Sequence, residues 1–573
     1  LFRSCAFAVQ LLGGALFLLH LQGGDGQGGV FDSGWRGLMT ASLIGLALIG
    51  GMLLAARDPL VKDDSRLLMG LSLVLLAGLA FVNLAVLFVL PWRSASAVWA
   101  GSGLLIIWLS LVLRQRLSFY FGLALQVVGG LAFLLAGPSL FGSLSGEGLR
   151  PLAHSGFWTP AVLALAALVG AWRLRRAGER ERALGIGTLG LAELSHLLLL
   201  WGAGWWALTA LCETVRFVPY GLREHALLLV AAATVASWML LALRERWREL
   251  ALLCLALVPV ALLALASAWR FDYQPFGEFG WLAWPLLFAT HLLSLRRLAP
   301  LLPAKALSVA HVLGCWLLLG VLALELRYLF ALLAEQYNAW RWLGWALVPS
   351  AYLLLVAGGR SLPWPLRDFP REYRLLAAAP VALLLLGWFW SANLLSDGAA
   401  EPLPYLPLAN PLELGLLIVL FALYRWSDAS LASLVDGNAS ARLGRQALAG
   451  ASLFALLTLA VCRAAHHLAG VPFQAEALAA SMLVQAGLSL VWTLCALGLT
   501  IAGTRLGRRD LWMVGAALVG VVVVKLFFVE LGNSGSLERI ISFIGVGVLL
   551  LVVGYFSPLP PRRAEVASEA EQP

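Results

Sequence analysis

The segment LWMVGAALVGVVVVKLFFV (511–529) decides the fold class, because Lys525 is its only charged residue. A helix needs about 20 mostly apolar residues to cross the hydrocarbon core of a bilayer. Similar runs recur along all 573 residues, of which 61% are hydrophobic and only 12% are charged. A soluble core could not bury that much apolar surface. The sequence therefore predicts a polytopic membrane protein.

These runs predict helices, because each segment in lipid must satisfy its own backbone polar groups. They are too long and too uniformly apolar for barrel strands. We expect an all-α fold, a polytopic transmembrane helix bundle of about 18 spans. The expected spans are 5–21, 37–56, 67–90, 97–113, 117–137, 156–172, 184–204, 225–243, 250–268, 281–295, 305–324, 342–357, 375–394, 412–424, 445–462, 479–503, 511–529 and 537–556.

The basic residues predict the orientation of these spans. With the amino terminus and every second loop on one side, that side holds most of the 40 basic residues, including RLRRAGERER (173–182) and RLGRRD (505–510). Cytoplasmic loops carry such an excess. We expect a multi-pass protein of the bacterial inner membrane with both ends cytoplasmic. The pI of 9.5 then follows from topology, and no nucleic acid partner is expected.

We expect a single transmembrane helical domain over 1–556 and a disordered cytoplasmic tail over 557–573. His196 precedes Trp201 at the same spacing as His311 precedes Trp316. The two segments lie four expected spans apart, which suggests a four-helix repeat of the kind found in transporters.

The carboxyl-terminal region carries a family motif. A Trp-bearing helix, a basic turn, a Lys-bearing helix and a closing helix follow in order, marked by Trp492, Arg508, Lys525, Glu530, Arg539, Ser542, Phe543, Gly545 and Gly547. Residues 489–556 resemble the predicted bacterial membrane proteins called domain of unknown function 2339, as does HVLGCWLLLGVLALELRYL (311–329). The resemblance implies an architecture, and more chain upstream of Leu1, but no activity.

Lys525 has two interpretations. An ammonium at the centre of a bilayer costs about 3 kcal/mol on insertion scales, but a lysine near a helix end can extend to the interface. The family motif favours an inward-facing ion pair, and we expect Glu538 or another acid of the outer loops as the partner.

Other polar side chains within the spans form a candidate intramembrane site. Glu193 and His196 share a helix face in the middle of an expected span, the spacing by which bundle helices offer metal ligands. No second Glu-x-x-His exists, so we expect no metal and no cofactor; hydrogen bonding between helices is the other interpretation. The candidate intramembrane site consists of Glu193, His196, His311 and Lys525.

The expected periplasmic loops combine arginines, acids and aromatic residues. Guanidinium groups bind phosphate and aromatic rings stack on sugars, as the head group of a lipid-linked glycan requires. An interfacial aromatic belt explains most of the 24 tryptophans equally well. The candidate ligand site consists of Glu213, Arg216, Arg223, Arg270, Asp272, Glu325, Arg327 and Arg341. We expect its loops, 213–225, 269–281 and 325–342, to meet.

Three functions are compatible with these patterns. We favour transport or handling of an amphipathic envelope substrate, with membrane lipids and a lipid-linked glycan or phospholipid as partners, because so many helices exceed what an anchor needs. A polytopic glycosyltransferase is an alternative, with Asp25 and Asp32 in an outer loop. The sequence lacks the common hydrolase, nucleotide-binding and metalloprotease motifs, which favours a protein that is not an enzyme. A scaffold binding envelope proteins is the third function.

Overall fold

The computed structural model describes residues 34–57, 65–113, 115–135, 150–180, 190–268, 273–334, 338–358, 362–435 and 439–526, with the single positions 544, 547, 548 and 551. Within these ranges the elements are helices, and the only β-type pairing is an isolated bridge between Ala400 and Leu403. The predicted all-α fold is confirmed. The chain divides into two compact units, Leu1–Ala268 and Trp269–Pro573.

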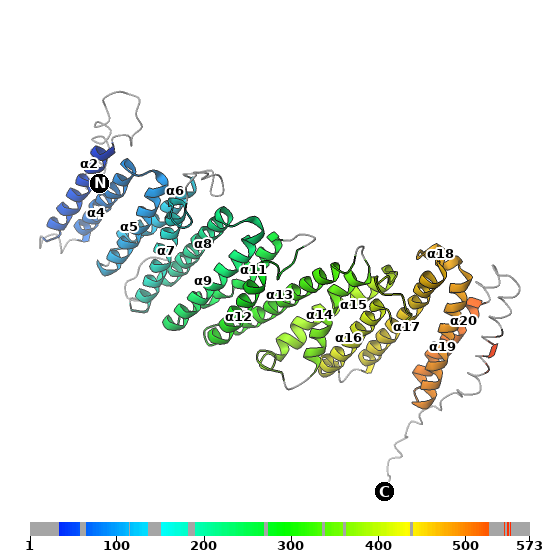
Figure 1. Cartoon of the computed structure of the whole chain (residues 1–573). Helices are drawn as coiled ribbons and strands as arrows, with labels where there is room; N and C mark the ends of the chain where they lie inside the picture. The colour runs from blue at the N-terminus through cyan, green and yellow to red at the C-terminus, as the bar shows by residue number, and fades with distance from the viewer. Residues whose placement is uncertain are drawn as a thin grey trace, which may run out of the picture. The chain divides into compact units, whose positions relative to one another are not determined.

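The first unit is a row of helical hairpins (Figure 1). Helices adjacent in sequence pack together, and glycines allow close approach. A Cβ atom on Gly103 would lie 2.8 Å from the carbonyl oxygen of Gly122, so only glycine permits this contact. The elements are α2 (Gly34–Ala55), α4 (Ser65–Ala85), η1 (Val86–Phe88), α5 (Trp92–Leu113), α6 (Arg116–Leu135), α7 (Ser155–Arg180), α8 (Leu191–Phe217), η3 (Tyr220–Leu222), α9 (Arg223–Glu245), α10 (Arg248–Cys254) and α11 (Leu257–Ala268).

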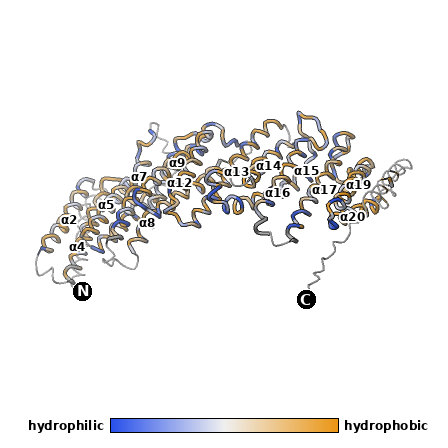
Figure 2. The backbone as a smooth tube through the Cα atoms, turned by 90° about the horizontal axis from the view of Figure 1, so that it is seen from below, coloured by the Kyte–Doolittle hydropathy of each residue, from blue (hydrophilic) through white to orange (hydrophobic). Residues whose placement is uncertain are grey.

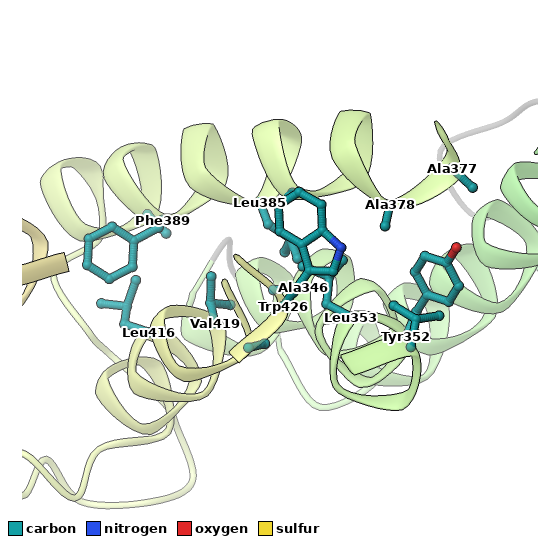
Figure 3. Packing of buried hydrophobic residues seen from close by; sticks show 14 of the residues in the cluster. Ala346, Tyr352, Leu353, Ala377, Ala378, Leu385, Phe389, Leu416, Val419 and Trp426 are labelled. Carbon is teal, nitrogen blue, oxygen red and sulfur yellow. The ribbon is translucent and has the colours of Figure 1, made fainter. Parts of the chain in front are cut away.

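The second unit has its largest core where three helices meet. Phe389 and Leu385 from one helix pack over Leu416 and Val419 of another and Leu353 of a third (Figure 3). The elements are α12 (Gly280–Leu298), α13 (Ala304–Ala331), α14 (Ala339–Ala357), the π-helix η4 (Glu372–Ala377), α15 (Ala378–Leu395), α16 (Pro411–Val435), α17 (Ala439–Ala469), α18 (Ala475–Ala480), α19 (Met482–Arg505) and α20 (Arg509–Lys525).

Every expected span between residues 37 and 529 coincides with a helix. Twelve helices of the described ranges are long and apolar enough to cross a membrane, and apolar residues run along them (Figure 2). The span expected at 250–268 is interrupted between α10 and α11. Pro259 follows that break, and its ring cannot pack against a regular preceding helical turn. The spans expected at 5–21 and 537–556 and the tail lie outside the described ranges, apart from the four single positions.

Candidate functional site

Three loops form proline-containing β-turns, at residues 150–153, 274–277 and 406–409. In each, the backbone N–H of the fourth residue donates to the carbonyl oxygen of the first, at 3.2, 3.2 and 3.1 Å. The second residue of each turn is proline, whose fixed φ angle suits that position. We call these segments the first, second and third proline turns.

Each proline turn precedes a long helix, namely α7, α12 and α16. The turns thus recur at every fourth helix when α10 and α11 are counted as one. Each of these helices leads away from its turn toward arginines: Arg175 and Arg176 on α7, Arg296 and Arg297 on α12, and Arg425 on α16. The turns mark the starts of three comparable groups of helices.

A glutamate binds each turn through the backbone N–H that follows the proline. A β-turn leaves the N–H of its third residue without a partner inside the turn, so this group is free to bind an external acceptor. Leu152 donates to Glu213 Oε1 at 2.7 Å, Phe276 to Glu325 Oε2 at 2.9 Å, and Leu408 to Glu413 Oε2. A carboxylate makes a stronger bond to an N–H than a neutral acceptor does.

The first two glutamates are arranged alike. Glu213 lies near the end of α8, and Glu325 near the end of α13, so each is delivered by the helix that returns to the turn. A side chain next to each turn supplies a second contact. His154 Nε2 lies 3.1 Å from Glu213 Oε2, and Gln274 Nε2 donates to Glu325 Oε1 at 2.9 Å.

The third turn differs, because its carboxylate and an arginine form a buried ion pair. Glu413 belongs to α16 itself, and the returning helix α17 supplies Arg463. Arg463 Nε donates to Glu413 Oε1 at 3.0 Å, and both side chains are 0% exposed. Removing one partner of such a pair leaves an uncompensated buried charge.

The end of α15 completes the surroundings of Arg463. Its Nη1 donates to the backbone carbonyl oxygen of Asn393 at 3.0 Å, and its Nη2 donates to Asn393 Oδ1 at 3.1 Å. Asn393 is fully buried, and its Nδ2 has no hydrogen-bond partner. We call Glu413, Arg463 and Asn393 the buried triad.

The loop between α15 and α16, residues 396–410, covers the buried triad. Tyr405 donates to Glu413 Oε1 at 2.8 Å, and its ring stacks on His467 with centroids 4.5 Å apart. Burial, and then the adjacent carboxylate of Glu413, raise the pKa of Tyr405, which keeps it a hydroxyl donor. Gly398 has a φ of 85°, and a Cβ there would lie 2.9 Å from Arg463 Cδ. The loop backbone therefore rests directly on the arginine.

The predicted ligand site is divided among structural contacts. Glu213 and Glu325 are the acceptors of the first and second turns. Arg223 donates to the carbonyl oxygens of Val218 and Val215, at 3.1 and 2.8 Å, and so caps the end of α8.

The other arginines of that predicted site also contact their own unit. Arg341 donates to Ala334 O at 3.3 Å, and the guanidinium of Arg327 lies 5.6 Å from the ring centroid of Trp345. Arg216 lies in the last turn of α8. Arg270 and Asp272 lie outside the described ranges.

The predicted meeting of three loops is seen for two of them. Glu325 joins segment 325–342 to Gln274 and Phe276 of segment 269–281. Segment 213–225 belongs to the other compact unit and is joined to the first proline turn through Glu213.

The predicted position of Glu193 and His196 in the middle of a span is wrong. Glu193 lies in the first turn of α8, where its carboxylate accepts the N–H of Gly190 and caps the helix. His196 follows one turn later, is about half exposed, and lies 3.3 Å from Glu249. The helix starts later than the apolar run suggested, which moves both residues to its end.

His311 is buried in α13, where its Nδ1 lies 3.0 Å from the hydroxyl of Tyr373 and its ring centroid lies 4.0 Å from that of Phe369. In the described part of the chain, no cluster of three or more His, Cys, Asp or Glu side chains could hold a metal ion.

Lys525 is directed toward α19. Its ammonium donates to the backbone oxygen of Gln485 at 2.8 Å and to Ser489 Oγ at 2.7 Å. The lysine is therefore inward-facing and part-buried rather than extended toward lipid. Glu530 and Glu538 lie outside the described ranges, so the expected ion pair stays a prediction.

Sequence reasoning missed the buried triad. The expected spans ended at Cys462 and began at Leu412, which left Arg463 in a loop and Glu413 at a helix end. The tetrapeptides PLAH (151–154), PFGE (275–278) and PLAN (407–410) share the turn proline and mark the three turns. They do not identify Arg463, because the distance from the turn proline to the residue on the returning helix differs in each group.

The comparison with protein families matches residues 150–560 to the family described as predicted membrane protein (DUF2339). The match starts at the first residue of the first proline turn. No curated protein and no solved structure matches the chain. The chain belongs to the DUF2339 family of predicted membrane proteins, as its carboxyl-terminal motif indicated.

Proposed function

We propose that this multi-pass membrane protein transports or otherwise handles an amphipathic envelope substrate, and that the third proline turn is its substrate-binding element. The buried triad is the observation that supports this proposal. The first two turns are each bound by a glutamate from the returning helix, so such a turn does not require an arginine. A buried ion pair is costly to desolvate, and strongly perturbed buried charges are frequent at functional sites.

Charge asymmetry supports a periplasmic position for the turns. The helices that start at the turns carry arginines toward their opposite ends, including Arg176, Arg297 and Arg425. Basic residues accumulate on the cytoplasmic side. In the proposed topology both chain ends are cytoplasmic, in a bacterial inner membrane, and the buried triad lies near the periplasmic surface.

Thiol labelling of intact cells tests this topology. In a variant without native cysteines, Leu403→Cys in the covering loop should react with a membrane-impermeant maleimide, because Leu403 is 49% exposed. Leu506→Cys, in the turn between α19 and α20 and 67% exposed, should react only after the cells are permeabilised. The reverse pattern would contradict the proposed orientation.

Transfer of fluorescent lipids between leaflets of reconstituted vesicles tests the function. A short-chain fluorescent phospholipid and a fluorescent lipid-linked sugar are the probes, and dithionite quenches those exposed outside. In protein-free vesicles dithionite quenches only the probe in the outer leaflet. With the protein present, we expect it to quench a larger fraction of one probe. The neutral double variant Glu413→Gln/Arg463→Met removes both buried charges together and should abolish the excess.

The same helices provide a matched control. Asp428 of α16 and Arg445 of α17 form an ion pair at 2.8 Å, in which the aspartate is 48% exposed. Asp428→Asn/Arg445→Met removes one negative and one positive charge from that solvent-accessible pair, as the first double variant does from the buried pair. It should leave lipid transfer intact. A protein that folds and moves neither probe would favour the scaffold function instead.

A further inference from the structure

One donor group of the buried triad has no acceptor. The guanidinium of Arg463 donates from Nε, Nη1 and Nη2, and it also interacts with the side chain of Tyr405. The fully buried Nδ2 of Asn393, by contrast, has no hydrogen-bond partner. This amide lies beside the guanidinium, because its Oδ1 accepts from Arg463 Nη2.

The carboxylate oxygens of the triad already bind other donors. Glu413 Oε1 accepts from Arg463 and Tyr405, and Glu413 Oε2 accepts the N–H of Leu408. Buried donors without acceptors are costly, and native proteins fill nearly all of them. Asn393 Nδ2 therefore calls for an oxygen from outside the triad.

Charge balance selects the kind of oxygen. Arg463 and Glu413 already neutralise each other, so a phosphate or carboxylate would leave net negative charge in a site of low dielectric. A hydroxyl group would bring a donor of its own to a place that already has an unpaired donor. A carbonyl oxygen brings two lone pairs and neither charge nor donor.

We propose that the third proline turn binds an uncharged ester or amide carbonyl oxygen of the substrate, held by Asn393 Nδ2 beside the guanidinium of Arg463. Acylated lipids and N-acetylated sugars both carry this group. The inference rests on the proposed function only for the identity of the molecule that carries the carbonyl, since binding can be measured without transport.

The covering loop sets the condition for access. His467 Nε2 lies 3.0 Å from the carbonyl oxygen of Asp397, and Asn410 Nδ2 donates to Gly398 O at 2.8 Å. These contacts hold the loop backbone on Arg463. The carbonyl reaches the donors when residues 396–398 move away from the arginine, and binding then competes with these two contacts.

Lipids that differ only in the carbonyl group test the proposal on the unmodified protein. In nanodiscs made of dialkyl ether phosphatidylcholine, we would titrate diacyl phosphatidylcholine as the ester probe and a dodecyl N-acetylglucosaminide as the amide probe. Native mass spectrometry measures the dissociation constants. The ester-free dialkyl lipid and dodecyl glucoside are the matched controls.

We expect one carbonyl probe to bind at least about tenfold more tightly than its control, the effect of one hydrogen bond from a charged donor. Preference for the ester identifies a lipid, and preference for the amide identifies an N-acetylated sugar. Asn393→Asp replaces the donor Nδ2 by an acceptor and should remove the preference. If it does not fold, Arg463→Lys, which keeps the charge but not the fork, should reduce it.

Equal binding of both carbonyl probes and their controls would overturn the proposal, because the donors would then be satisfied by water. A carbonyl preference without lipid transfer would refute the proposed transport and leave the binding site standing. Lipid transfer without a carbonyl preference would refute the binding site and leave the proposed transport standing.

Discussion

The first and third proline turns both have a backbone N–H group bound by a glutamate, but the side chains around that glutamate differ. Both are β-turns whose post-proline N–H is bound by a glutamate. The first uses Glu213, which is 14% exposed and is contacted by His154, whereas the third uses a carboxylate and a guanidinium that are both fully buried. The first group of helices binds its turn with a glutamate alone. The third group uses a buried ion pair, whose desolvation costs free energy.

This internal difference indicates where function lies. Repeated elements of one chain share the same structural requirements, so what the copies have in common is needed for folding. The glutamate belongs to that common part. Arg463, and Asn393 with its unpaired Nδ2, belong to the part that the copies do not share.

The largest expected effect is on Arg463. Arg463→Met leaves Glu413 as an unpaired buried charge and should lower the free energy of unfolding by about 3–5 kcal/mol. Unfolding in mixed detergent micelles measures this change. Adding Glu413→Gln to the same chain should restore most of the loss, because the second charge is removed as well.

The exposed ion pair between Asp428 and Arg445 lies on the same two helices and is the reference for that change in stability. Asp428→Asn/Arg445→Met should change the free energy of unfolding by less than about 1 kcal/mol, since surface ion pairs contribute little. Similar losses in the Arg463→Met and Arg445→Met single variants would mean that the buried triad is accessible to water.

The glutamates of the first two turns should show a smaller effect. Glu213→Gln keeps an acceptor oxygen but loses the charge that strengthens the bond from Leu152, and Glu325→Gln does the same for Phe276. We expect each to cost about 1–2 kcal/mol in the same unfolding measurement. A cost as large as that of Arg463→Met at either position would remove the contrast between the turns.

The helices of this protein were predictable because a long apolar segment in lipid satisfies its backbone N–H and C=O groups by forming a helix. Every expected span from 37 to 529 has a helix, and errors concern ends and interruptions. The start of α8 was placed too early because an apolar run does not mark a cap. That error put Glu193 and His196 in the middle of the helix, although the carboxylate caps its start.

The candidate site was predictable only in part. Glu213 and Glu325 stood out as acids beside arginines, but the groups that they bind are backbone N–H groups, which have no signature in residue type. Arg463 follows directly on an apolar run, and sequence alone does not separate a loop arginine from a buried one. Comparison of the three tetrapeptides locates the turns but not Arg463, because the returning helices lie at different distances along the chain from their turns.

The smallest expected effect concerns the backbone of the turns themselves. Leu152 and Leu408 both have a φ of 63°, in the left-handed region that costs a branched side chain about 1–2 kcal/mol. Both side chains are about half exposed, so little burial is lost on truncation. Leu152→Gly and Leu408→Gly should therefore each raise the free energy of unfolding by up to about 1 kcal/mol, after the entropy cost of glycine.

Phe276 supplies the control for this prediction, because it occupies the same position in the second turn without a positive φ. Phe276→Gly gains nothing from the backbone and should lower the free energy of unfolding by about 0.5–1 kcal/mol or more. If Leu408→Gly stabilised the protein but Leu152→Gly did not, strain would be specific to the third turn. If both leucine variants behaved like Phe276→Gly, the left-handed conformation would not be a cost in either turn, and the difference between the turns would lie in the buried triad alone.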